Sequence, residues 1–105
     1  MIEKKLVRPE LKRGAPHGFG WVDHRLVRER RTAGCANDSL ALYLVLVTVA
    51  DSEGLSYWSE MSLRRLLGLE VAEFRRARSE LEAAGLVAYD PPIWQVLELA
   101  GGPGL

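Results

Sequence analysis

Apolar residues recur at helical spacing in the second half of the chain. Val71, Phe74, Ala77 and Leu81 follow one another at intervals of three or four residues, and Gly85 comes soon after the last of them. This spacing places the four side chains on one face of a helix, and glycine is common just past a helix end. The pattern predicts an amphipathic helix that ends before Gly85.

A shorter helix is predicted directly before it. Ser59 has the short polar side chain that caps a first turn, and the apolar positions after it continue to Leu67. Gly68 then interrupts the pattern, and its conformational freedom suits a tight break between two helices. Residues 60–86 therefore predict a helix, a turn and a second helix.

The stretch from Leu40 to Ala50 is apolar almost all the way round a helix, which predicts that other elements surround it. Residues 37–39, Asn-Asp-Ser, supply helix-capping chemistry before it. The β-branched valines at positions 45, 47 and 49 leave a strand as the alternative, but the stretch is long for one strand. We therefore predict a buried helix here.

Three short segments have strand character. Residues 55–58 alternate briefly, residues 86–89 are apolar, and residues 93–99 alternate again. Asp90-Pro91-Pro92 separates the last two segments and forces a turn. Residues 86–99 therefore predict a β-hairpin.

The beginning of the chain follows neither pattern. Glycine and proline recur over residues 14–20, which disfavours both a helix and a central strand, so residues 1–22 predict an arm. Phe19 and Trp21 are predicted to anchor the end of this arm to the core.

A short helix is then expected over residues 23–31, with Asp23 as its cap and with Leu26 and Val27 turned inward. Residues 23–99 would form the folded body, and residues 100–105 a flexible tail.

Composition adds a charge asymmetry to this picture. A chain of 105 residues with 48% apolar and 27% charged residues is typical of one globular domain, and its net charge is zero. Residues 1–31 nevertheless hold nine Lys and Arg against four acids, whereas the remainder holds five against ten. The basic arm is suited to phosphates or to an acidic partner, the alternative being ordinary solvated charge.

Other chemistry is not indicated. One cysteine excludes an intramolecular disulfide, no signal-peptide pattern is visible, and the longest apolar run is about half of the ~20 residues that span a bilayer. We therefore expect a cytoplasmic protein without membrane contact. No phosphate loop, catalytic carboxylate pair, nucleophile motif or metal-ligand motif appears, so we expect neither an enzyme nor a metal or other cofactor.

Taken in order, the predicted elements resemble the winged helix-turn-helix family over residues 37–99. The turn at residues 67–69, the apolar spacing that follows it and the Ala-Gly-Leu-Val junction at residues 84–87 carry this resemblance. It implies an α+β, mainly α fold with a three-helix core and a small β-hairpin wing, here with a basic N-terminal arm. The segments ALYLVLVTVADSEG and AGLVAYDPPIWQVL more narrowly resemble winged-helix domains of bacterial mobile elements, plasmid replication initiators and transposition proteins.

The resemblance implies double-stranded DNA binding through the helix after Gly68, in a transcription regulator or a replication or transposition accessory protein. Such a helix enters the major groove, the preceding helix holds the phosphates, and arginine suits both contacts. The residues implied in DNA binding are Arg64 and Arg65 on the first helix, Ala72, Arg75, Arg76, Arg78 and Ser79 on the second, and Lys4, Lys5, Lys12 and Arg13 in the arm.

The charges of this motif leave a second interpretation open. Residues 60–82 contain five arginines and five acids, which can pair with one another on a solvated face, and the turn at residues 90–92 has no cation. The alternative is a winged-helix protein–protein interaction module in a larger replication or transposition assembly. A homodimer would double the site, and either the long apolar helix or the segment before it would supply the interface, but the sequence does not select between them. The position of the arm relative to Arg75 and Arg76 discriminates between the two interpretations.

Overall fold

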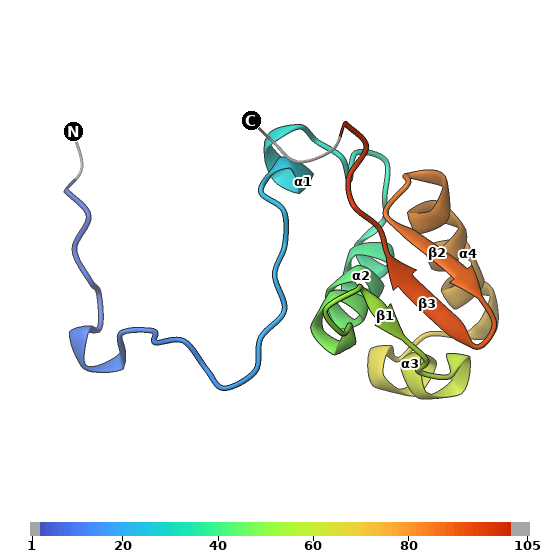
Figure 1. The fold of residues 1–105 in the computed structure, drawn as a ribbon, viewed down its shortest axis with the longest axis horizontal. Helices are drawn as coiled ribbons and strands as arrows, with labels where there is room; N and C mark the ends of the chain where they lie inside the picture. The colour runs from blue at the N-terminus through green and yellow to red at the C-terminus, as the bar shows by residue number, and fades with distance from the viewer. Residues whose placement is uncertain (1–2, 102–105) are drawn as a thin grey trace.

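The computed structural model describes residues 3–101. Over this range the chain is α+β and mainly helical, with four α-helices and a three-stranded antiparallel sheet (Figure 1). Among these residues no helix is long and apolar enough to cross a membrane. The elements are a 3-10 turn (Pro9–Leu11), α1 (Arg25–Arg28), α2 (Asn37–Val49), β1 (Leu55–Ser56), α3 (Glu60–Leu67), α4 (Val71–Ala83), β2 (Val87–Asp90) and β3 (Ile93–Val96).

The sheet has β3 at its centre, with β2 and β1 on its two sides. The predicted hairpin is confirmed, because β2 pairs with β3 in a register that sets Tyr89 opposite Trp94. β1 pairs with the other edge of β3, with Leu55 opposite Gln95. The indole ring of Trp94 is buried, stacks on Tyr89 and meets Phe74 of α4 edge-on, which joins the sheet to the helices.

The core lies between α2, α3, α4 and the sheet. Leu42 and Leu46 of α2, Leu63 of α3 and the inner face of α4 are all fully buried. That inner face consists of Phe74, Ala77 and Leu81, as their spacing predicts.

The connection between α3 and α4 also follows the prediction. The Ser59 hydroxyl accepts the Ser62 N–H at 3.1 Å and caps α3. Gly68 ends the helix in the left-handed conformation, with φ at 68°. Only three residues, 68–70, separate α3 from α4, so the two helices are fixed relative to each other.

The predicted aromatic anchors of the arm are wrong. Phe19 and Trp21 are 69% and 76% exposed. The arm instead meets the body through Gly20, where an added Cβ would lie 2.7 Å from the Val47 carbonyl oxygen. A backbone that approaches this closely leaves no room for a side chain at position 20.

The helix predicted over residues 23–31 is one turn long, Arg25–Arg28. Leu26 is buried as expected, but Val27 is 76% exposed, because a single turn on the surface presents one inward position. The Asp23 carboxylate accepts the Arg25 N–H at 2.8 Å, although the helix begins after His24.

The expectation that α2 is surrounded on all sides is also wrong. Its buried side chains lie on the side that faces the core, whereas Leu44 is 62% exposed. The capping predicted from residues 37–39 is wrong, because these residues lie inside the first turn, the N-cap is Ala36, and no side chain of that turn caps the helix. The carboxylate of Glu80, from α4, takes over that function.

The described part of the arm, residues 3–22, is exposed throughout. Figure 1 shows this segment in blue, running from α1 on the side of the body opposite α4. Residues 1–2 of the predicted arm and 102–105 of the predicted tail lie outside the described range.

Candidate functional site

The outward face of α4 is the first candidate site. Ala72, Arg75, Arg76 and Ser79 are exposed, and Arg78 is half-buried beside the hairpin. The burial of the opposite face in the core fixes this orientation, since side chains three and four residues apart share a face. At the start of the helix, Glu73 accepts the Glu70 N–H at 2.9 Å in a capping box, so the first-turn acids are engaged with the backbone.

Each arginine of α4 lies beside a carboxylate. Arg75 is 3.4 Å from Glu60 of α3, in an exposed pair. Arg78 is 3.6 Å from Glu82, and its guanidinium lies 5.3 Å from the centre of the Tyr89 ring. The third pairing, that of Arg76, connects two helices.

Arg76 and Glu80 join α4 to the beginning of α2. Arg76 contacts Asp38 of α2 and donates to Glu80 at 2.8 Å. Glu80 also accepts the Ala36 N–H at 2.8 Å and the Ser39 hydroxyl at 2.7 Å. These bonds to Ala36, Ser39 and Arg76, in that order of effect, lower the pKa of Glu80 to about 2. Arg76 therefore has a structural contact that the sequence did not reveal.

Of the two arginines of α3, one is used in the fold and the other is available to a partner. Arg64 is half-buried and donates from Nε to the Leu69 carbonyl at 3.2 Å, while its own carbonyl accepts the Leu69 N–H at 3.1 Å. It thereby closes the turn between α3 and α4. Arg65 is exposed, with no hydrogen bond or ion pair to its side chain among residues 3–101.

The arm residues are not gathered with these side chains. Lys4, Lys5, Lys12 and Arg13 are exposed in a segment on the side of the body away from α4 (Figure 1). The structure thus separates the predicted residues into a face formed by α3 and α4 and a distant basic arm. The turn between β2 and β3, Pro91-Pro92, adds no charge to either.

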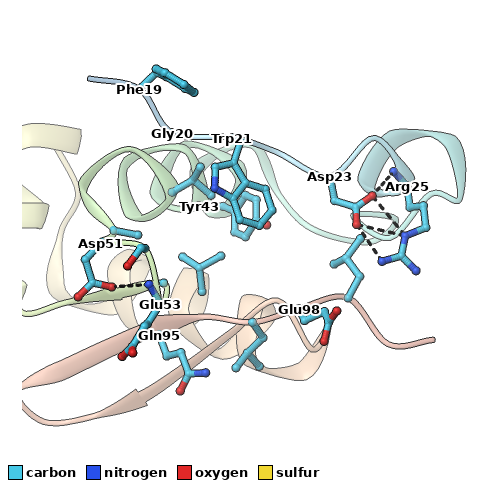
Figure 2. A pocket seen from close by; sticks show the side chains of 17 residues that line it. Phe19, Gly20, Trp21, Asp23, Arg25, Tyr43, Asp51, Glu53, Gln95 and Glu98 are labelled. Atoms are coloured by element: carbon cyan, nitrogen blue, oxygen red, sulfur yellow. Dashed lines mark hydrogen bonds and ion pairs between the residues drawn. The ribbon is translucent and has the colours of Figure 1, made fainter. Parts of the chain in front are cut away.

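A second candidate, which the sequence did not reveal, is a groove of about 880 Å³. We call it the acidic groove. It is lined by residues 19–21, Asp23 and Arg25, by Tyr43, Val47 and Ala50, by the turn at residues 51–54 and by residues 95–99. In Figure 2, Trp21 projects into it, and Asp51, Glu53 and Glu98 lie along the opposite side. The sequence offers one signal for this groove, the aromatic pair Phe19 and Trp21. Because both side chains are apolar, however, the sequence predicts that they lie in the core and not at the edge of a groove.

Comparisons of the chain with protein-family models, with curated proteins and with solved structures found no match. A function for this chain is therefore inferred from its fold and from the two candidate surfaces.

Proposed function

We propose that the chain is a winged helix-turn-helix protein that binds double-stranded DNA, with α4 as its recognition helix. One observation carries the proposal: α4 buries Phe74, Ala77 and Leu81 and leaves a polar face in solvent, directly after a short turn from α3. The major groove is wide enough to accept an α-helix, and a helix that is held by its inner face can present its outer face to the bases. In this proposal the β2–β3 hairpin would serve as the wing.

Arg75 and Ser79 are the side chains we assign to the groove, with Ala72 one turn earlier. Arg75 would exchange Glu60 for a base edge or a phosphate, and this exchange costs little because an exposed ion pair contributes about 0–1 kcal/mol. Arg65 would hold a phosphate from α3. Arg76 keeps its contacts with α2, so we assign it to the fold rather than to DNA.

The biological role that we propose is that of a transcription regulator or an accessory protein in replication or transposition. This part rests on the family resemblance alone, because the geometry of α4 is shared by proteins of all three kinds.

Binding to a random-sequence duplex, measured by fluorescence anisotropy at several salt concentrations, tests the proposal. Arg65→Ala and Arg75→Ala should each weaken binding several-fold and reduce the salt slope by about 1. Arg28→Ala in α1 removes the same charge away from α3 and α4 and should change neither quantity (Figure 1). If all three variants lose the same affinity, binding depends only on the net charge of the protein, and the proposed DNA-binding face is wrong.

A protein–protein interaction module is the second candidate, and the position of the arm supports it. The basic residues of the arm lie away from α4, and the arginines of α4 are paired with acids. If no duplex binding is detected at low salt, this candidate replaces the first, because electrostatic attraction to phosphates is strongest there.

A further inference from the structure

The acidic groove combines exposed aromatic surface with carboxylates that have no cationic partner. Among residues 3–101, no ion pair includes Asp51, Glu53 or Glu98. Asp23 and Arg25 also line the groove, and they pair with each other at 2.8 Å, so the three other carboxylates leave the lining net negative. Asp51 uses one carboxylate oxygen to accept the N–H groups of Glu53 and Leu55, which orders the turn. The groove therefore presents negative charge along an apolar wall.

The N-terminal arm has the complementary chemistry. Lys4, Lys12 and Arg13 make no ion pair within the described residues, whereas Lys5 and Arg8 each lie beside a glutamate of the arm. Three large apolar side chains of the arm, Leu6, Val7 and Leu11, are exposed. A segment that exposes both cations and large apolar side chains is suited to a groove of opposite charge that also offers apolar surface.

The backbone at the groove offers a place for an extended segment. The pairing of β3 with the β1 side ends where the Gly54 carbonyl accepts the Val96 N–H at 2.8 Å. Beyond that point residues 97–99 border the groove instead of a strand. A segment lying there would continue the line of β1, as in recognition by strand addition.

We propose that the acidic groove binds the N-terminal arm of a second copy of this chain, and that the two copies exchange arms. In each copy the arm leads away from its own body, so a partner can receive it without a reversal of the chain (Figure 1). Reciprocal exchange closes the assembly as a symmetric dimer and leaves α4 uncovered. The proposal is independent of DNA binding, because it uses a different surface.

Charge reversal tests the exchange. Sedimentation equilibrium of the full chain over a range of concentrations should show a dimer that weakens as salt is raised. Glu53→Lys with Glu98→Lys in the groove, or Lys12→Glu with Arg13→Glu in the arm, should weaken dimerisation about tenfold or more. Glu82→Lys with Asp90→Lys makes the same charge change as the groove variant outside the groove and should leave the dimer intact.

Mixing the two reversed variants gives the sharpest outcome. The reversed arm of the arm variant then matches the reversed groove of the groove variant, and the native arm of the groove variant matches the native groove of the arm variant. The mixture should therefore form a heterodimer, whereas each variant alone should be monomeric. Circular dichroism of each variant confirms that it is folded. The proposal is wrong if the native chain stays monomeric, which includes the case in which the arm closes on the groove of its own chain. It is also wrong if the mixture of the two variants forms no heterodimer.

Discussion

Glu80 shows how one distant side chain can replace the cap that residues 37–39 do not provide. The first turn of α2 has no capping side chain of its own, yet the Ala36 N–H and the Ser39 hydroxyl both bond to the Glu80 carboxylate. An unpaired backbone N–H at a helix start is costly when it is partly buried, so α4 stabilises the start of α2. Arg76 completes the contact by bonding both Glu80 and Asp38.

The low pKa of Glu80 makes this contact dependent on pH. A carboxyl group whose pKa falls from 4.5 to about 2 on folding stabilises the folded chain above pH 4.5, and that contribution is lost as the pH falls toward 2. Glu80→Gln should therefore lower the free energy of unfolding at pH 7, and the difference from the native chain should shrink below pH 4.5. Urea unfolding at pH 7, 5 and 3 measures it. A difference that is the same at all three pH values would contradict the assignment.

Ser59 provides a cap of the ordinary kind, from the residue that the sequence indicates. Ser59→Ala removes the acceptor for the Ser62 N–H and should destabilise the chain by about 1 kcal/mol. The matched control is Ser79→Ala, because Ser79 is exposed in the middle of α4 and alanine favours a helix. Thermal unfolding should show a lower midpoint for the first variant and no decrease for the second.

At the scale of elements, the turn between α3 and α4 determines how the outward face of α4 is presented. Gly68 has φ at 68° and no atom within 4 Å of an added Cβ, so an alanine there would meet backbone strain but no clash. Gly68→Ala should cost roughly 1–2 kcal/mol of stability. Gly14→Ala, in the arm and also without neighbours within 4 Å, should cost little. Equal unfolding midpoints for the two variants would argue against a strained turn.

The elements with a strong local signal were predictable from the sequence. The spacing of Phe74, Ala77 and Leu81 and the residues at the helix ends, Ser59 and Gly68, indicated α3, α4 and the connection between them. Two prolines indicated the turn of the hairpin. These signals are local because they arise from helix periodicity, from capping and from the restricted backbone of proline.

The failures have a tertiary cause. Val27, Leu44, Phe19 and Trp21 are all large and apolar, and all are exposed. Hydrophobicity indicates that a residue can be buried, but the available partners decide whether it is, and α1 and the end of the arm have few. For Trp21, exposure helps to form the acidic groove, which no local pattern could indicate.

At the scale of the whole molecule, the candidate DNA site was predictable as a helix face but not in its details. Sequence periodicity identified the outward positions of α4, whereas the pairing of Arg76 with Asp38, 38 residues away, and the use of Arg64 in the turn depend on the fold. The position of the arm is also a tertiary property. It divides the positive charge between two surfaces, and we propose DNA for one and a second copy for the other.

This division predicts separable functions. Deleting residues 1–13 should abolish dimerisation, whereas the affinity of a monomer for one short duplex should change by less than about threefold, because a distant cation is screened beyond ~10 Å at ordinary salt. Sedimentation and anisotropy on the same preparation measure both quantities. A large loss of DNA affinity in the deletion variant would show that the arm contacts the DNA phosphates.

The most direct test of the central proposal is a map of amide chemical shifts during titration with a short duplex. If α4 is the recognition helix, the amides of Arg65, Ala72, Arg75 and Ser79 should shift in proportion to the bound fraction, while those of residues 95–99 in the acidic groove should not. Arg75→Ala should weaken the titration without changing the spectrum of the free protein elsewhere. The absence of any shift at low salt, or shifts confined to residues outside α3 and α4, would contradict DNA recognition by this helix.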